Sequence, residues 1–365
     1  MTKRKEYKLG DVLAVRYGKD HKPLGNGQYP VYGSGGIMRY ADRYLYDKES
    51  ILIPRKGSLN NIFYQEGPFW TVDTMFWTEI DKAKVEPKFL FYQLTLVDLE
   101  NLNVGSAVPS LTVPVINDID ITLPPLDEQK RIAGVLSSLD DKIDLLNREN
   151  VTLEALAETL FRHYFIENPN PTWKEGKIAD LVDFNPSRKL TKNEDSPYIE
   201  MANIETQGYA PSSWRMRPFA SGTKFINGDA IMARISPCLE NGKAAYIDFL
   251  EDGQVGWGST EFLVMRSKMG LHPFFAYIMT RYDDFRDHAV SSLVGSSGRQ
   301  RVDLDNLLKY SIFIPDEKAI TSFNREMEMI VSKMRNNQLQ MRTLAFQRDI
   351  ILPRLMSGEV KVIGL

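Results

Sequence analysis

The sequence predicts an α+β protein: two similar mixed α/β domains separated by two long antiparallel coiled-coil helices, in a pseudo-two-fold internal repeat. Two heptad-patterned stretches, 123–165 and 313–360, carry this prediction. Each stretch follows a block of strand-and-turn sequence. A shift of 191 positions places Pro124 on Pro315 and preserves the heptad phase. The chain is therefore organised as block, long helix, block, long helix.

The first block, residues 1–123, has the pattern of a mixed α+β domain with turn-rich sheets. Residues 49–65 are expected to form a strand, a polar and basic turn that contains glycine, and a second strand. Residues 87–96 should form a helix opened by Pro87, because proline is favourable in the first turn of a helix.

The first long helix is predicted over residues 124–167. Pro124 and Pro125 prevent a preceding helix from continuing into this segment. Asp127 and Glu128 are favourable at a helix N-terminus. The prolines in 168–171 end it. Its apolar positions alternate between spacings of four and three, which defines a seam for a partner helix. The seam comprises Ile132, Leu136, Leu139, Ile143, Leu146, Asn150 and Leu153.

The second block, residues 168–314, resembles the first segment by segment. Residues 177–184 match 8–15, and 228–248 match the strand-turn-strand segment 49–65. Three further matches complete the block: 257–267 with 70–80, 273–282 with 87–96, and 293–315 with 103–124. We therefore expect a second domain of the same type.

The second long helix is predicted over residues 315–358. Gly358 is a suitable cap for its end, whereas Pro353 should kink the helix or end it early. Its seam contains three methionines, for which a place in the core is expected. The seam comprises Phe323, Met327, Ile330, Met334, Asn337, Met341 and Leu344.

The two long helices are expected to pair with each other. Each has about 40 residues and a length of roughly 60 Å, and long isolated helices are marginally stable in water. Because the linker after residue 165 leads into the second block, an antiparallel pair is expected. Asn150 and Asn337 either fix the register as buried polar residues or lie at solvated, frayed stretches. Both possibilities remain open at this point.

Composition restricts the class of protein. The chain has 365 residues with 43% hydrophobic and 25% charged residues, which is typical of two folded domains. Cys238 is the single cysteine, so an intramolecular disulfide is impossible and a reducing cytoplasm is expected. Four scattered histidines argue against a metal site. Neither a signal peptide nor a membrane span is expected.

Bulk charge gives no support for nucleic-acid binding. The net charge is -3, residues 1–123 carry 15 Lys+Arg and 15 Asp+Glu, and residues 167–315 carry 17 and 19. A protein that binds DNA normally presents a basic surface. If this chain binds DNA, its basic residues must cluster on one face or a partner must supply positive charge.

The order of these elements and three motifs resemble the specificity subunit of type I restriction–modification systems. The motifs are LPPLDEQKRI at 123–132, FRHYF at 161–165 and ILPRLMSGEV at 351–360. Residues 29–76 are similar to a target-recognition domain of that family. The resemblance covers the whole chain. The second helix departs from the pattern because Asp316, Glu317 and Lys318 replace the Glu-Gln-Lys-Arg run.

The resemblance implies a non-catalytic subunit that binds double-stranded DNA. Residues 1–123 and 168–314 would be target-recognition domains, each recognising one half of a bipartite site. The helices at 124–167 and 315–358 would set the spacing and dock two methyltransferase (M) subunits. Motor nuclease (R) subunits would join the complex. No cofactor would bind this chain, since S-adenosylmethionine and ATP are expected on the partner subunits, and no membrane is implied.

The residues themselves also argue against catalysis. An adenine methyltransferase needs a glycine-rich cofactor loop and an Asn/Asp-Pro-Pro-aromatic motif. Asn185-Pro186-Ser187 lacks the second proline and the aromatic residue, and the glycine-rich run 33–36 precedes no clear helix. The chain has no Walker motif.

Candidate DNA contacts are polar and basic residues in the predicted loops, since these side chains bind base edges and phosphates. Plain solvation is the alternative for each of them. In the first block the candidates are Ser34, Arg39, Arg55, Lys56, Ser58, Asn60, Asn61, Ser106 and Ser110. In the second block they are Arg234, Ser236, Asn241, Lys243, Arg299, Gln300 and Arg301. Four tryptophans, Trp70, Trp77, Trp214 and Trp257, are expected to serve packing rather than base stacking.

Two other functions compete with DNA recognition. The first is a non-catalytic oligomeric scaffold or protein-interaction protein, which would give no sequence-specific DNA protection even with partners present. The second is a stand-alone DNA methyltransferase, which would bind the methyl-donor cofactor by itself.

Overall fold

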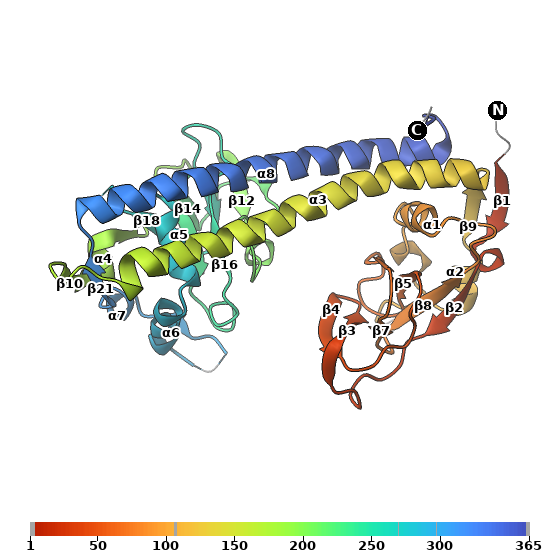
Figure 1. Ribbon diagram of the computed structural model, residues 1–365, viewed down its shortest axis with the longest axis horizontal. Helices are drawn as coiled ribbons and strands as arrows, with labels where there is room; N and C mark the ends of the chain where they lie inside the picture. The colour runs from red at the N-terminus through yellow and green to blue at the C-terminus, as the bar shows by residue number, and fades with distance from the viewer. Residues whose placement is uncertain (1–3, 106–107, 269, 297, 363–365) are drawn as a thin grey trace. The chain divides into compact units, whose positions relative to one another are not determined.

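The computed structural model describes residues 4–105, 108–268, 270–296 and 298–362 (Figure 1). The chain divides into two compact units. The first unit is Met1–Ile143 with Arg342–Leu365, and the second is Asp144–Met341. Two long helices, α3 (Leu126–Phe161) and α8 (Glu317–Ser357), contribute to both units.

The first unit is a mixed domain of short strands and helices. Its strands are β1 (Lys5–Lys8), β2 (Leu13–Tyr17), β3 (Asn26–Gly33), β4 (Gly36–Ala41), β5 (Ser50–Pro54), β6 (Phe63–Gln65), β7 (Trp70–Thr71), β8 (Met75–Ile80) and β9 (Asp120–Leu123). Its short helices are η1 (Leu9–Asp11), α1 (Pro87–Leu94), η2 (Glu100–Leu102) and α2 (Val113–Asn117). The strands form sheets in the orders β2-β8-β5-β6, β4-β3-β7 and β1-β9, with the β3–β7 pair parallel.

Strand β5 is buried along its whole length and separates two cores. Because successive side chains of a strand point to opposite faces, Ile51 and Ile53 face one side and Leu52 faces the other. Ile51 and Ile53 join a core that includes residues of α1, α3 and α8, whereas Leu52 joins the core beside β3 and β7 that contains Phe69. The first unit is therefore anchored to its segments of the long helices.

The second unit has the same kind of architecture. Its strands are β10 (Lys174–Lys177), β11 (Val182–Phe184), β12 (Asp195–Ile199), β13 (Arg215–Pro218), β14 (Thr223–Phe225), β15 (Ala230–Ala233), β16 (Ala244–Tyr246), β17 (Gly256–Gly258), β18 (Phe262–Ser267), β19 (Leu293–Val294), β20 (Arg301–Val302) and β21 (Ser311–Ile314). Its short helices are α4 (Ile178–Leu181), η4 (Met201–Asn203), α5 (Phe274–Arg281), α6 (Asp283–Ser291) and α7 (Leu304–Leu307). The sheet orders are β11-β18-β15-β16, β13-β12-β17-β14, β10-β21 and β19-β20.

The two units share details as well as element types. The order β11-β18-β15-β16 corresponds to β2-β8-β5-β6, and the pair β10-β21 to β1-β9. Each unit also has a helical turn directly after its first strand. The backbone N–H of Lys8 donates to Asp11 Oδ2 at 2.8 Å, and that of Lys177 donates to Asp180 Oδ2 at 2.8 Å. The predicted mixture of helices and strands with two long helices is confirmed.

Side-chain hydrogen bonds mark the start of each long helix, and a π-helical turn follows the end of α3. At the start of α3, the buried Gln129 side chain donates to Pro124 O at 2.8 Å and accepts from Glu86 N at 2.9 Å. At the start of α8, Asp316 accepts from Ala319 N at 2.8 Å. Residues Arg162–Glu167 form a π-helical turn after α3.

Of the two effects expected of Pro353, a kink or an early end of α8, the early end was wrong. The helix does not end early at Pro353 but continues to Ser357, and Gly358 follows with a left-handed φ of 80°. Proline at 353 removes one backbone donor and crowds the preceding turn, but packing of Leu352 and Leu355 into the core of the first unit stabilises this last stretch.

The two helices run antiparallel within each unit. In the second unit, the Phe165 ring lies 4.8 Å from that of Phe323, and Asn150 contacts Asn337. In the first unit, Arg348 Nη1 donates to Asp140 Oδ1 at 2.6 Å. No predicted seam residue is exposed; Asn150 and Asn337 are buried, so their placement at solvated, frayed stretches was wrong.

Candidate nucleic-acid interface

Three chain segments meet at one edge of the first unit: the loop after β5, the turn between β7 and β8, and the loop before α2. Arg55 N donates to Thr74 O at 2.8 Å. Leu111 N donates to Arg55 O at 2.9 Å, and Gly57 N donates to Pro109 O at 3.1 Å. Backbone hydrogen bonds therefore fix the three segments to one another, and we call this edge the first loop edge.

Several predicted contact residues lie together on the first loop edge. Lys56 and Ser58 are exposed, and Asn61 Nδ2 donates to Ser34 O at 2.7 Å. Gly57 has a left-handed φ of 92°, and a Cβ added there would lie 3.1 Å from Ser34 Oγ. Glycine is therefore needed for the close approach of the 55–61 loop to the turn between β3 and β4.

Arg55 is held more firmly than its exposed neighbours. Its guanidinium lies 5.4 Å from the centre of the Tyr17 ring, and Nη1 donates to Asp73 O at 3.2 Å. A guanidinium stacked on an aromatic ring keeps its remaining donors available. Arg55 can therefore present a pre-ordered cation at this edge.

Two predicted contact residues have internal roles instead. The half-buried Arg39 donates from Nη2 to Leu24 O at 2.7 Å and Gly25 O at 2.9 Å. Asn60 Oδ1 accepts from Leu99 N at 2.7 Å, which satisfies a donor at the start of η2. Both side chains stabilise loops of the first unit.

The final loop of the first unit contains the two predicted serines. Ser106 lies outside the described residues. Ser110 pairs with Lys56 as an isolated antiparallel bridge, and its N–H donates to Asn103 Oδ1 at 2.8 Å. The backbone therefore brings Ser110 next to the exposed Lys56.

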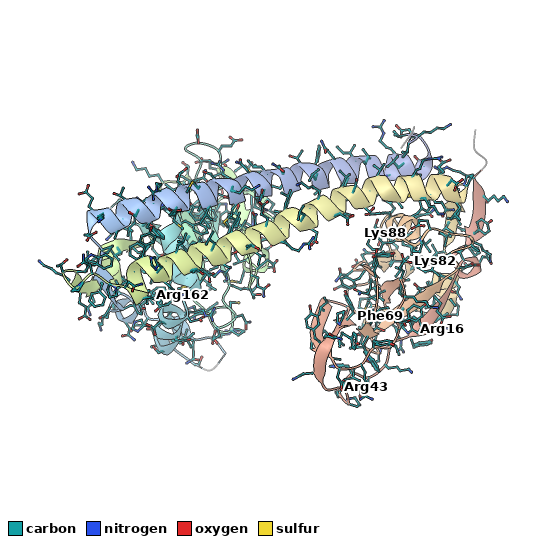
Figure 2. The ribbon with its side chains drawn as sticks, in the orientation of Figure 1. Arg16, Arg43, Phe69, Lys82, Lys88 and Arg162 are labelled. Atoms are coloured by element: carbon teal, nitrogen blue, oxygen red, sulfur yellow. The ribbon has the colours of Figure 1, made fainter. Side chains whose placement is uncertain are left out.

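Several other surface cations of the first unit form ion pairs with carboxylates; Figure 2 labels three of them, Arg16, Lys82 and Lys88. Arg16 lies 3.1 Å from Glu79, and Lys82 pairs with Glu49. Lys88 lies 2.9 Å from Glu66. Paired cations contribute less to the attraction of a polyanion, so Lys56 on the first loop edge is a stronger candidate for phosphate contact than these residues.

The second unit repeats the same backbone arrangement. Arg234 N donates to Glu261 O at 2.9 Å, and Val302 N donates to Arg234 O at 2.9 Å. Ser236 N donates to Gln300 O at 3.0 Å. Arg234 thus takes the place of Arg55, and Glu261 takes the place of Thr74. We call this the second loop edge.

Some side chains of the 234–243 loop are held by hydrogen bonds within the unit, and others are exposed to solvent. Arg234 Nη2 donates to Val302 O at 3.2 Å, and Lys243 Nζ donates to Met201 O at 3.0 Å. Ser236 Oγ donates to Glu240 Oε1 at 2.5 Å, and Asn241 is exposed. Asn241 is therefore the predicted contact of this loop best placed to meet a ligand.

The run Arg299-Gln300-Arg301 also lies on the second loop edge. Arg299 is exposed beside Gly298, which has a left-handed φ of 78°. Arg301 donates from Nη2 to Glu261 Oε1 at 2.6 Å and from Nε to Glu261 Oε2 at 2.9 Å. This hydrogen bonding to Glu261 raises the pKa of the Arg301 guanidinium further above its ordinary value.

Glu261 and the two arginines of β13 are not among the predicted contact residues. Arg217 lies 4.8 Å from the ring centre of Tyr198, and Arg215 lies 5.8 Å from the same ring. All four residues of β13 are exposed. The alternation Arg-Met-Arg in 215–217 places both arginines on one face of a strand and could have marked them.

The four tryptophans have packing or hydrogen-bonding partners within their units. Trp70 Nε1 donates to Lys19 O at 2.9 Å, and Trp77 Nε1 donates to Tyr17 O at 3.2 Å. Trp257 is buried, and Trp214 stacks on Phe249 with ring centres 3.9 Å apart.

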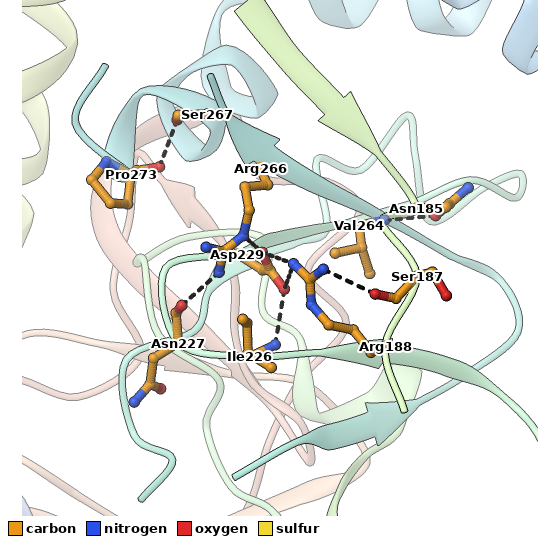
Figure 3. A network of polar contacts seen from close by, with 10 residues as sticks. All are labelled: Asn185, Ser187, Arg188, Ile226, Asn227, Asp229, Val264, Arg266, Ser267 and Pro273. Carbon is orange, nitrogen blue, oxygen red and sulfur yellow. Dashed lines mark hydrogen bonds and ion pairs between the residues drawn. The ribbon is translucent and has the colours of Figure 1, made fainter. Parts of the chain in front are cut away.

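A buried ion network fixes the start of β15, the strand that leads into the second loop edge (Figure 3). Asp229 is fully buried and accepts from Arg266 Nε at 2.5 Å and from Arg188 Nη2 at 3.3 Å. Ile226 N also donates to Asp229, at 2.8 Å. A buried carboxylate with several donors holds its surroundings in one arrangement, because losing a partner leaves an uncompensated charge.

The described residues hold no cluster of three or more His, Cys, Asp or Glu side chains that could bind a metal ion. Among the same residues, no helix has the length and apolar character needed to cross a membrane.

Comparisons with known proteins find sequences similar to this chain among type I restriction specificity subunits. Residues 1–155 match the family described as type I restriction modification DNA specificity domain. The chain is 24% identical to the type I restriction enzyme MjaIX specificity subunit of Methanocaldococcus jannaschii, over 99% of this chain and 89% of that protein. It is 20% identical to the HindI specificity subunit of Haemophilus influenzae, over 76% and 78%.

A solved structure has the same fold. The crystal structure of a type I restriction–modification S subunit from M. genitalium superposes with a TM-score of 0.59 at 15% identity, over 97% of this chain and 96% of that one.

Proposed function

Because this chain belongs to the family of type I restriction–modification specificity subunits, we propose that it recognises a bipartite DNA sequence for such a complex and performs no chemistry itself. Each loop edge would bind one half of the site. The proposal assigns residues 1–123 and 168–314 to target recognition and residues 124–167 and 315–358 to the spacer helices.

The observation that carries this proposal is the repeated backbone arrangement of the two loop edges. Arg55 and Arg234 each donate to a turn and accept from the final loop of their unit, with the same pattern of bonds. The side chains on this shared frame differ: Lys56 and Ser110 occur in the first unit, and Ile235 and Arg301 occur at the matching places in the second. A constant frame with different side chains is suited to recognition of two different half-sites.

We propose that the long helices bind two methyltransferase (M) subunits, which motor nuclease (R) subunits then join. Apolar side chains that do not pack in the seam support this role. Phe346 on α8 is 66% exposed, Met329 on α8 is 59% exposed and Leu145 on α3 is 50% exposed. Exposed large apolar residues on otherwise polar helices suit a protein interface. S-adenosylmethionine and ATP would be bound by these partners.

The net charge of the chain suggests how the affinity for DNA is divided between this chain and its partner subunits. The chain has a net charge of -3, and several surface cations are paired with carboxylates. Since phosphate contacts dominate DNA affinity, the subunit alone would bind weakly, and its partners would supply much of the phosphate contact. Tight specific binding by the isolated chain at physiological salt would contradict this division.

Methylome sequencing of cells that carry this chain with its methyltransferase tests the proposal. We expect a bipartite methylated motif. Exchange of residues 1–123 for the matching block of a relative should change one half of the motif, and exchange of 168–314 should change only the other half. A motif that is not bipartite, or a block exchange that alters both halves, would refute the assignment.

A further inference from the structure

The pair formed by Arg301 and Glu261 is more ordered than an exposed ion pair usually is. Two nitrogens of the guanidinium, Nε and Nη2, donate to one carboxylate at distances of 2.6–3.0 Å. The Arg301 side chain is still 48% exposed, whereas that of Glu261 is 22% exposed. Glu261 is therefore the more covered member of the pair, and the Arg301 side chain is the more accessible one.

The backbone fixes both members of the pair. Glu261 N donates to Ser259 Oγ at 3.1 Å, and Glu261 O accepts from Arg234 N at 2.9 Å. Arg301 pairs with Val294 in the β19–β20 hairpin and with Ile235 in a single bridge. Because both ends are held, little side-chain entropy is lost when the guanidinium binds a ligand.

The bonds to Glu261 use only one edge of the guanidinium. A guanidinium has five N–H donors in a planar fork, and the Nε–Nη2 edge is taken up by the carboxylate. In the part of the chain that the structure describes, no residue accepts a hydrogen bond from Nη1. The Nη1–Nη2 edge therefore keeps two parallel donors that point away from Glu261.

We propose that Arg301 recognises a guanine base in the half-site of the second unit, with Glu261 as its positioning residue. Two parallel N–H donors match O6 and N7, the two major-groove acceptors of guanine. A phosphate would accept the same donors, but a carboxylate paired with the cation weakens attraction to the DNA backbone and favours a ligand bound by geometry. This inference rests on the proposed DNA-recognition function.

The first unit supports a role in specificity rather than in folding. The shift of 191 positions that relates the long helices places Ser110 on Arg301. Ser110 forms the same single bridge with the 55–61 loop that Arg301 forms with the 234–243 loop. Thr74 occupies the place of Glu261. The frame thus forms without an Arg–Glu pair, so this pair is a feature of the second unit alone.

Motif sequencing of complexes of the full chain with its methyltransferase subunits tests the inference. The wild-type complex should methylate a motif with a G·C pair in the half assigned to the second unit by block exchange. Arg301→Ala should relax selection at that one pair by at least about fivefold, the lower range for a bidentate arginine–guanine contact. Arg301→Lys should not restore it, because an amine lacks the fork. Glu261→Gln should weaken selection at the same pair.

A chemical probe provides a second readout that a merely structural role would not move. With 7-deazaguanine at that pair, which lacks the N7 acceptor, the wild-type complex should bind more weakly, and the Arg301→Ala complex should show no further loss. Arg299→Ala is the matched control: Arg299 is exposed in the same loop, and its loss should weaken binding to all sequences without changing the motif.

The outcomes separate the two proposals. A wild-type complex with no bipartite motif would overturn the proposed function itself. A bipartite motif with no G·C pair in that half, an unchanged motif in Arg301→Lys, or a uniform loss of affinity in Arg301→Ala would overturn the guanine assignment alone. If Arg301→Ala fails to fold, Arg301→Lys and the 7-deazaguanine probe still decide between guanine and phosphate.

Discussion

Asn337 donates a hydrogen bond from Nδ2 to Asn150 Oδ1 at 2.9 Å, in the buried seam between α8 and α3. Asn150 Nδ2 in turn donates to Met334 O at 3.3 Å. An amide pair inside an apolar seam is less stabilising than two leucines but penalises any shift in register, since a shifted helix would leave both amides unpaired.

Replacement of one member of this pair should be more damaging than replacement of both. Asn337→Leu leaves Asn150 Oδ1 without its donor, and we expect a loss of about 1–3 kcal/mol in the free energy of unfolding. The double variant Asn150→Leu/Asn337→Leu removes both buried amides and should be at least as stable as the wild type. Urea denaturation measures both values.

Asn336→Leu is the control for this prediction, because Asn336 is the exposed neighbour of Asn337 on α8. It should change stability by no more than about 0.5 kcal/mol. If the single and double seam variants lose the same stability, the amides are not energetically coupled.

Stability should also fall at acidic pH because of His272. Its Nδ1 accepts from Phe274 N at 3.1 Å at the start of α5, so protonation of that nitrogen would break the bond. Burial lowers the pKa of His272 below its ordinary value of 6.5, against the opposing effect of Glu328. The unfolded chain therefore takes up a proton first, and stability present above pH 6.5 is lost as the pH falls toward the pKa of the folded state.

The measurement is the free energy of unfolding between pH 7.5 and 5 for the wild type and for His272→Asn, whose side chain can accept the same bond at every pH. The wild type should lose up to about 1.4 kcal/mol per pH unit more than the variant. His163→Asn, at an exposed position, should keep the wild-type pH dependence. Equal slopes for the wild type and His272→Asn would remove His272 as the cause.

Lys56 should contribute to phosphate binding in the assembled complex. It is exposed on the first loop edge and makes no ion pair with a described residue. Lys56→Ala should weaken binding to all DNA sequences and lower the slope of log affinity against log salt by about 0.9. Fluorescence anisotropy at several salt concentrations gives this slope.

Lys82→Ala is the matched control, because Lys82 is already paired with Glu49 on the same unit. Its salt dependence should equal that of the wild type. Equal slopes for Lys56→Ala and the wild type would show that the first loop edge makes no phosphate contact at this position.

Helix periodicity and turn chemistry predicted much of the fold. The heptad positions are buried or half-buried throughout, and the proline-opened segments formed α1 and, directly after Pro273, α5. These features depend on residues close in sequence. Partners chosen by tertiary structure could not be predicted in this way: Glu261 precedes Arg301 by 40 positions, and Asn60 satisfies the backbone of Leu99. Only the structure therefore shows which loop side chains are bonded to other residues of their unit and which are available to a ligand.

The long helices lead to a final prediction about the spacing of the two half-sites. Duplication of the heptad 143–149 in α3, together with the opposing heptad 338–344 in α8, keeps the seam in phase. Seven residues lengthen each helix by about 10 Å, which corresponds to roughly three base pairs of DNA. We expect the methylated motif to keep both half-sites while its unspecified spacer grows by about this amount. Duplication in α3 alone would leave the added heptad unpaired and should reduce stability instead. A double duplication that folds and methylates DNA with the original spacer would show that the helices do not set the spacing.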